Sequence, residues 1–147
     1  MREGTDMNKS IFCVFLLTIC FGQALAQMQE LAEFKGVNLP FALKSENVLL
    51  EKGKYDFILI KNLPNFFLLR IKKQGKTISL ISGGEKIDYP GQGNLGLLQN
   101  NPDIPKFGKL TIKRDPTLRI AYIILETGKQ AALCPLHKIR FKLDSLE

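Results

Sequence analysis

At several places in this sequence, short runs of alternating apolar and polar residues are separated by only two or three residues. Lys52-Gly53 and Gln74-Gly75 are two-residue connections typical of β-hairpins. Parallel strands need a crossover of a dozen or more residues, so runs joined this closely are antiparallel neighbours. No segment of 12 or more residues beyond residue 26 has a convincing 3.6-residue period. The sequence therefore predicts an all-β domain, a single antiparallel meander of about eight to ten strands that is closed as a small barrel or folded as a sandwich.

The most continuously apolar run after residue 26 spans residues 118–125, and it is rich in β-branched and aromatic side chains that suit a strand. Turn residues flank it, Asp115-Pro116-Thr117 before and Thr127-Gly128-Lys129 after. We expect a strand here that is buried on much of both faces.

Residues 1–26 have the pattern of a cleavable signal peptide. Lys9 supplies the positive charge, residues 11–20 the apolar stretch, and Ala24-Leu25-Ala26 the small residues that a signal peptidase reads. The apolar stretch is about ten residues long, shorter than the ~20 that a membrane span needs, which argues against an uncleaved membrane anchor. We expect a protein exported to the periplasm or the extracellular space, with no transmembrane span in the mature chain.

The 121 residues that follow the leader are enough for one domain. Residues 27–37 have apolar side chains at helical spacing, but the run is too short to decide between a short helix and a loose arm. Residues 38–147 carry the β pattern. Cys134 is the only cysteine after the leader, so no disulfide forms within the domain and the thiol is either buried or pairs between chains.

The net charge of +7 lies entirely after residue 26, because the charges of the leader cancel. Outside the cytoplasm, a basic surface favours anionic envelope lipids, acidic glycans or extracellular nucleic acid. We expect the partner to be an envelope protein or an anionic surface of lipid or glycan. Solubility alone also accounts for a charge of this size.

One set of basic residues gathers on a single strand face. Lys138, Arg140 and Lys142 alternate with apolar residues in the last predicted strand, and we expect them to face outward as a basic row. A row of this kind would meet phosphates or acidic glycans, and the alternative is the solvated outer face of a sheet. Aromatic side chains that stack on bases are not evident there, which argues against nucleic acid. Neighbouring strands are expected to extend the row with Arg70, Lys72 and Lys113.

Residues 82–108 break the strand pattern, because glycines and prolines recur there. A connection this long in a compact domain is either a functional loop or a passive surface loop. We treat Tyr89, Gly91 and Gly93 as candidate ligand-binding residues of this loop. Residues 91–96 match G-x-G-x-x-G by letter, but no apolar strand precedes them and no long helix follows, so a dinucleotide site is not expected.

The residues for catalysis are sparse. Glu85 and Asp88 form the only close carboxylate pair of this loop, with Asp103 further on, and a hydrolase that uses them is the enzymatic alternative. Cys134 and His137, the only thiol of the mature chain and the only imidazole, are too few to bind a metal, and their odd spacing turns them to opposite faces of a strand. We expect a non-enzymatic protein with no cofactor and no metal.

A second functional alternative is a small β-barrel that carries an apolar ligand. Its pocket would be lined by aromatic and aliphatic residues of the predicted strands, which otherwise form the core. These residues are Tyr55, Phe57, Phe67, Leu69 and Tyr122.

Residues 50–55, Leu-Glu-Lys-Gly-Lys-Tyr, have the pattern L-x-x-G-x-Y. It resembles the start of a strand in small exported bacterial β-domains, most of them uncharacterised. The resemblance covers about a dozen residues, implies a bacterial envelope protein without an assigned enzymatic activity, and transfers no site residue. Together these observations predict an exported, non-enzymatic β-domain that serves as a binding or structural module of the cell envelope.

Overall fold

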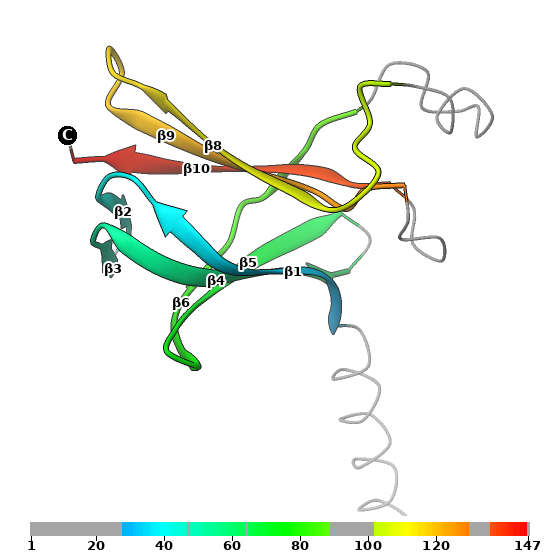
Figure 1. Ribbon diagram of the computed structural model, residues 1–147, viewed down its shortest axis with the longest axis horizontal. Coiled ribbons are helices and arrows are strands. Elements are labelled where there is room, and N and C mark those ends of the chain that lie inside the picture. The colour runs from blue at the N-terminus through cyan, green and yellow to red at the C-terminus, as the bar shows by residue number, and fades with distance from the viewer. Residues whose placement is uncertain (1–27, 47, 64, 89–101, 130–135, 147) are drawn as a thin grey trace, which may run out of the picture.

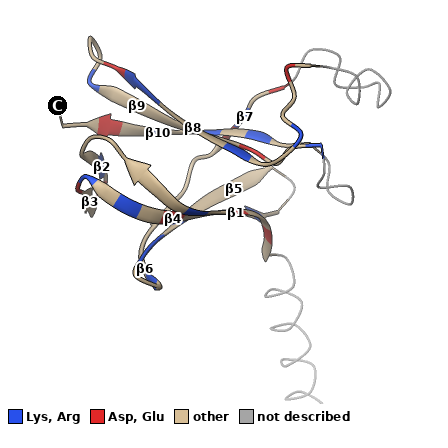
Figure 2. Cartoon of the chain, viewed as in Figure 1, with Lys and Arg blue, Asp and Glu red and all other residues tan. Residues whose placement is uncertain are grey.

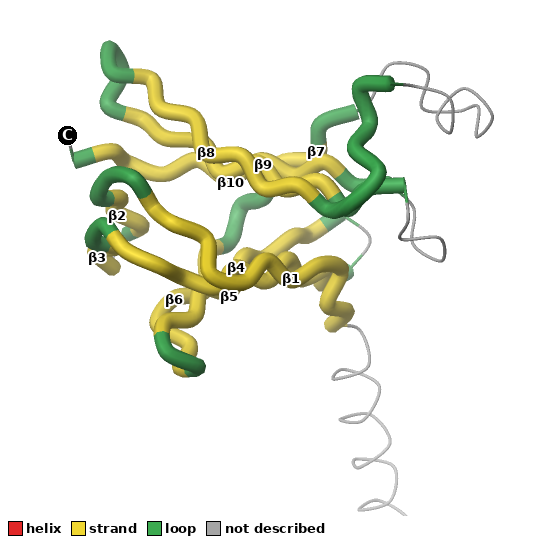
Figure 3. Tube along the Cα trace, viewed as in Figure 1, coloured by secondary structure: helices red, strands yellow, loops and turns green. Residues whose placement is uncertain are grey.

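The computed structural model describes residues 28–46, 48–63, 65–88, 102–129 and 136–146. The predicted signal peptide at residues 1–26 and the candidate residues Tyr89, Gly91, Gly93 and Cys134 lie outside these ranges. The described residues contain no helix, so the all-β prediction is confirmed (Figure 3). Their ten strands are β1 (Met28–Leu39), β2 (Leu43–Ser45), β3 (Val48–Leu50), β4 (Gly53–Asn62), β5 (Phe66–Lys73), β6 (Lys76–Ile81), β7 (Glu85–Lys86), β8 (Lys109–Asp115), β9 (Ile120–Glu126) and β10 (Lys138–Ser145).

The strands form two antiparallel sheets that lie as two layers (Figure 1). The four-stranded sheet has the order β1-β4-β5-β6, and the six-stranded sheet has the order β3-β2-β10-β9-β8 with β7 also paired to β10. Two short strands share one edge of β10, because β2 pairs at Asp144 and Ser145 and β7 pairs at Ile139 and Arg140. The predictions of a single meander and of a closed barrel are therefore wrong, and the two antiparallel sheets match the alternative of a sandwich.

The chain changes sheet at three short connections, residues 40–42, 51–52 and 82–84. Lys52-Gly53, predicted as a hairpin turn, belongs to one of them, because β3 pairs with β2 whereas β4 pairs with β1 and β5. A two-residue turn and a two-residue change of sheet look alike in sequence. Gln74-Gly75, by contrast, is a hairpin turn, and both residues have the positive φ angles (52° and 78°) of the favoured two-residue type.

The inner faces of the two sheets share one core. Phe57 and Leu69 of the four-stranded sheet and Ile123 and Phe141 of the six-stranded sheet are fully buried in the same cluster. The inward residues recur at every second position of their strands, as the sequence predicts. In β4 and β5, outer-face residues are buried as well. Burial of apolar surface on this scale is the dominant stabilising contribution to such a domain.

The N-terminal segment is a strand and not the predicted short helix or loose arm at residues 27–37. β1 runs antiparallel to β4 along nearly its whole length. Its pairing register shifts between Glu30 and Ala32 and again between Phe34 and Val37. Leu31 and Ala32 consequently both pack against the core despite their helical spacing. Pairing with β4 thus overrides the weak helical preference of this segment. The β-domain consequently begins about ten residues earlier than the sequence predicts.

The predicted strand at residues 118–125 corresponds to β9, which lies between β8 and β10. Leu118 and Arg119 belong instead to the preceding turn, where Leu118 is 61% exposed. Ala121 and Ile123 are fully buried on the inner face, whereas Tyr122 on the outer face is only half-buried. The prediction that this strand is buried on much of both faces is therefore only partly confirmed.

The predicted loop at residues 82–108 contains β7, which joins the six-stranded sheet beside β10. Gly84 makes this possible, since a Cβ atom there would lie 2.6 Å from the Phe141 ring and 2.9 Å from Ile139. Its N–H also donates to the carbonyl of Phe67 at 3.4 Å, which connects the two sheets. Part of the loop is thus structural.

Candidate functional site

The cations that the sequence places in one row lie on two different sheets (Figure 2). Lys138, Arg140 and Lys142 face outward from β10, and Lys113 of β8 joins them because both Lys113 and Lys142 pair with Tyr122 of β9. Arg70 and Lys72 belong to β5 in the other sheet, so the predicted extension of the row onto that strand is wrong. Sequence alternation assigns a face within a strand but does not reveal which sheet the strand joins.

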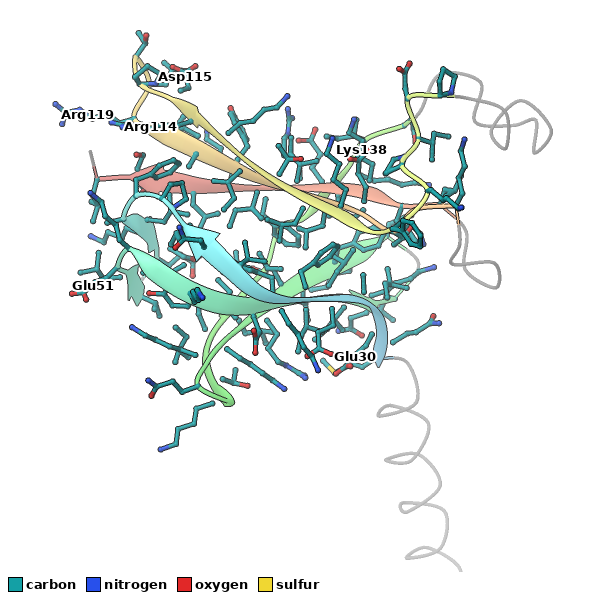
Figure 4. The ribbon with its side chains drawn as sticks, in the orientation of Figure 1. Glu30, Glu51, Arg114, Asp115, Arg119 and Lys138 are labelled. Atoms are coloured by element: carbon teal, nitrogen blue, oxygen red, sulfur yellow. The ribbon has the colours of Figure 1, made fainter. Side chains whose placement is uncertain are left out.

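Acidic side chains neutralise much of the basic row. Lys138, on the outer face of the six-stranded sheet (Figure 4), lies 3.9 Å from Glu126. Arg140 donates from Nε to Glu85 at 3.2 Å and also lies over the Tyr122 ring, 5.1 Å from its centroid. The hydrogen bond from Arg140 to Glu85 raises the pKa of the guanidinium. The row is therefore part of a sheet face on which positive and negative side chains alternate in pairs.

A second basic surface lies on the β5–β6 hairpin. Residues 66–84 contain four cations and no acidic residue. We call the exposed side of this hairpin the hairpin surface. It consists of Arg70 and Lys72 on the outer face of β5, exposed Phe66, Ile78 and Leu80, and Lys73 and Lys76 at the tip. Lys73 and Lys76 pair with each other and turn to the other face, where the Lys73 ammonium lies 5.3 Å from the centroid of the Tyr55 ring.

Apolar side chains accompany these cations. Leu80 is 54% exposed and Phe66 is 43% exposed, both on the outer face of the four-stranded sheet. On the same face, Ile58, Ile60 and Leu68 form a small buried cluster of their own. This side of the sheet therefore combines exposed apolar groups with Arg70, which pairs with Glu30, and with Lys72, which lies opposite Asp56 in the strand register.

An ion pair covers part of the apolar cluster. Arg70 pairs with Ile58 and Glu30 pairs with Ile60 in the strand registers, and the Arg70 guanidinium reaches Glu30 diagonally across β4 at 3.1 Å. Glu30 lies beneath the four-stranded sheet in Figure 4. Ile58 and Ile60 consequently remain only 2% and 1% exposed on a face that has no second layer among the described residues.

The predicted apolar pocket is not assembled. Tyr55, Phe57, Phe67 and Leu69 belong to the core, each at most 3% exposed. Tyr122 points to the opposite side of the six-stranded sheet, because the inner positions of β9 are Ala121, Ile123 and Leu125. The hydroxyl of Tyr55 donates to the carbonyl of Glu51 at 2.7 Å, which secures the L-x-x-G-x-Y segment.

The carboxylates of the hydrolase alternative lie at exposed positions. Glu85 accepts hydrogen bonds from Arg140, and Asp88 and Asp103 are exposed. Within the described part of the chain, no group of three or more His, Cys, Asp or Glu side chains is arranged to hold a metal.

His137 is a buried titratable group, and sequence reasoning, which considered it only together with Cys134, missed its burial. It directly precedes β10 and is only 4% exposed. Burial, together with the positive charges of Lys61 and Lys86, lowers its pKa from 6.5 to about 4. Neither ring nitrogen has a hydrogen-bond partner in the part of the chain that the structure describes.

Comparison with known proteins identifies no relative, because no family model, curated protein or solved structure matches the chain. The resemblance of residues 50–55 to exported bacterial β-domains therefore stays a prediction. Over the described ranges, the structure contains no helix of the length and apolarity needed to cross a membrane.

Proposed function

We propose that this protein is an exported, non-enzymatic β-domain of the cell envelope that attaches to an anionic lipid surface through the hairpin surface. One observation carries the proposal: cations and exposed apolar side chains occur together on β5 and β6, in a segment without acidic residues. The export signal at residues 1–26 and the net charge of +7 support a basic protein that acts outside the cytoplasm.

The exposed apolar side chains favour a lipid surface over a glycan. Leu80 and Phe66 have no role in contacts with sulfates or carboxylates of a glycan, whereas a bilayer interface accepts apolar side chains at the acyl boundary and cations at the phosphates. Each cation near an anionic membrane contributes about 1 kcal/mol, and the contribution falls with salt. Lys72 and the tip residue Lys76 would therefore give weak, reversible attachment, which the apolar side chains strengthen.

Vesicle sedimentation with matched variants tests this function. Lys72→Gln with Lys76→Gln removes two charges from the hairpin surface, and Lys113→Gln with Lys142→Gln removes two from the outer face of the six-stranded sheet. On vesicles of phosphatidylglycerol and phosphatidylcholine, we expect the hairpin variant to bind about 30-fold more weakly, since two cations contribute about 2 kcal/mol. The other variant should bind nearly as well as the parent. All proteins keep the same N-terminal segment, so its contribution is common to every measurement.

A third variant separates lipid from glycan binding. Leu80→Gln should weaken sedimentation with anionic vesicles by about tenfold, because an apolar side chain no longer enters the interface. Its retention on heparin should not change, since heparin offers charge but no apolar phase. Equal losses in the two charge variants, or none in the hairpin variant, would reject the hairpin surface as the attachment site. A loss of heparin retention in Leu80→Gln would contradict the lipid assignment.

A further inference from the structure

A separate feature lies at the end of the core where β10 begins. His137 precedes Ile139, whose side chain is fully buried, so strand alternation turns both residues inward. The His137 ring meets the Phe67 ring edge-on with centroids 5.4 Å apart. The His137 backbone N–H donates to the Thr127 hydroxyl at 3.0 Å, which fixes the chain there. The imidazole is therefore held in place by packing and backbone bonds, with both ring nitrogens left without partners in the described ranges.

Two lysines converge on this end from opposite sheets. Lys61 of β4 pairs with Phe67 of β5, and Lys86 of β7 pairs with Ile139 of β10. Phe67 and Ile139 are inward-facing core residues, so the two lysines occupy inward-facing positions at the ends of their strands. The hydrogen bond from the N–H of Gly84 to the carbonyl of Phe67 brings β7 next to β5.

The positive charge at this end is not balanced. Burial is the largest cause of the lowered pKa of His137, the positive charges of Lys61 and Lys86 lower it further, and no carboxylate acts in the opposite direction. Neither lysine has an ion pair within the described part of the chain. Buried polar groups are normally hydrogen-bonded, and a buried imidazole without partners beside two cations is arranged for an anion with acceptor oxygens.

We propose that His137, Lys61 and Lys86 form a binding site for a small oxyanion, a carboxylate or a phosphate group. One N–H of the neutral imidazole would donate to an oxygen of the anion, and the two ammonium groups would balance its charge. Lys86 is exposed and Lys61 half-buried, so the anion would enter past the lysines and meet His137 behind them. The site is distinct from the hairpin surface and independent of the proposed lipid attachment.

The protein offers a direct probe, because His137 is its only histidine. The imidazole proton resonances of the full chain are followed by NMR at pH 7 during titration with sodium phosphate, with sodium acetate and with sodium chloride, at constant ionic strength. We expect a saturable shift with phosphate, with acetate or with both, and none with chloride. Saturation by acetate alone identifies a carboxylate site, and saturation by phosphate alone identifies a phosphate site.

Matched variants locate the site. Lys61→Gln with Lys86→Gln should raise the Kd of the bound anion by about tenfold or more, because two charge-assisted contacts are lost. Lys113→Gln with Lys142→Gln should leave that Kd unchanged. In the parent protein the bound anion should also raise the pKa of His137, since a negative charge nearby favours the imidazolium. Absence of a saturable shift with either anion, or an unchanged Kd in the Lys61/Lys86 variant, would overturn the proposal.

Discussion

Arg70 of β5 donates a hydrogen bond to Glu30 of β1 at 3.1 Å across the intervening strand β4, although 40 residues separate them in the sequence. Both side chains lie on the outer face of the four-stranded sheet, above Ile58 and Ile60. The pair thus shields an apolar cluster from water. Because Arg70 is bound to Glu30, its charge is also less available to a partner of the hairpin surface.

Two substitutions can therefore separate the contribution of the Arg70 charge to the free energy of unfolding from the contribution of its aliphatic stem. The pair is partly exposed, at 30% for Arg70 and 62% for Glu30, so Glu30→Gln should lower the free energy of unfolding by less than ~0.5 kcal/mol. Arg70→Ala also uncovers Ile58 and should cost about 1–2 kcal/mol. Urea denaturation measures both. Equal losses would mean that the Arg70 stem does not shield the cluster.

Gly84 allows β7 to cross close to the core, so its replacement should be costly. Gly84→Ala places a Cβ atom against the Phe141 ring and should lower the free energy of unfolding by about 1–3 kcal/mol. Ser82→Ala, at an exposed position in the same connection, serves as the control and should change it by less than ~0.5 kcal/mol. Phe141→Leu should make the Gly84→Ala change less harmful. Additive losses in the double variant would argue against direct contact.

The lowered pKa of His137 predicts a pH-dependent stability. The unfolded chain has the ordinary value of 6.5 and the folded chain about 4, so the unfolded state binds the proton first as pH falls. The contribution of His137 to the free energy of unfolding should be fully present above pH 6.5 and should decrease between pH 6.5 and 4. The total decrease from this group should be at most about 3 kcal/mol. Urea denaturation in chloride buffers at pH 7 and pH 4.5 measures the loss.

His137→Leu is the matched variant, because leucine cannot titrate. Carboxylates also titrate at acidic pH, so the decisive quantity is the difference between parent and variant. The parent should lose more stability than His137→Leu between pH 7 and 4.5. Parallel pH profiles would show that the imidazole has similar pKa values in the folded and unfolded states.

The hydroxyl of Tyr55 should contribute to stability through its bond to the Glu51 carbonyl. Tyr55→Phe removes this 2.7 Å hydrogen bond and should lower the free energy of unfolding by about 1 kcal/mol. Tyr122→Phe is the control, since the Tyr122 hydroxyl makes no hydrogen bond to the described residues, and it should cost less than ~0.5 kcal/mol. Thermal denaturation ranks the two variants, and the reverse order would contradict the assignment.

The hairpin surface shows how much of the site the sequence already contains. The absence of acidic residues from residues 66–84 is visible in the sequence, as are Arg70 and Lys72 on one face of a strand. The exposure of Leu80 is not visible, because an apolar residue in a strand is equally compatible with a core position. Likewise, the burial of His137 follows from its packing between the two sheets, and its neighbours do not indicate it.

The sequence by itself determined the strand class, most strand positions and the inward residues of β4, β5 and β10. These follow from a two-residue period, which is a local property of the backbone. Only the tertiary structure decided which strands pair, because the same short connection either turns a hairpin or carries the chain to the opposite sheet. The choice of pairing partner depends on the apolar surface that both sheets bury together. This pairing draws residues 28–39 into a strand and places Arg70 and Arg140 on different sheets. It also brings Lys61 and Lys86 to His137.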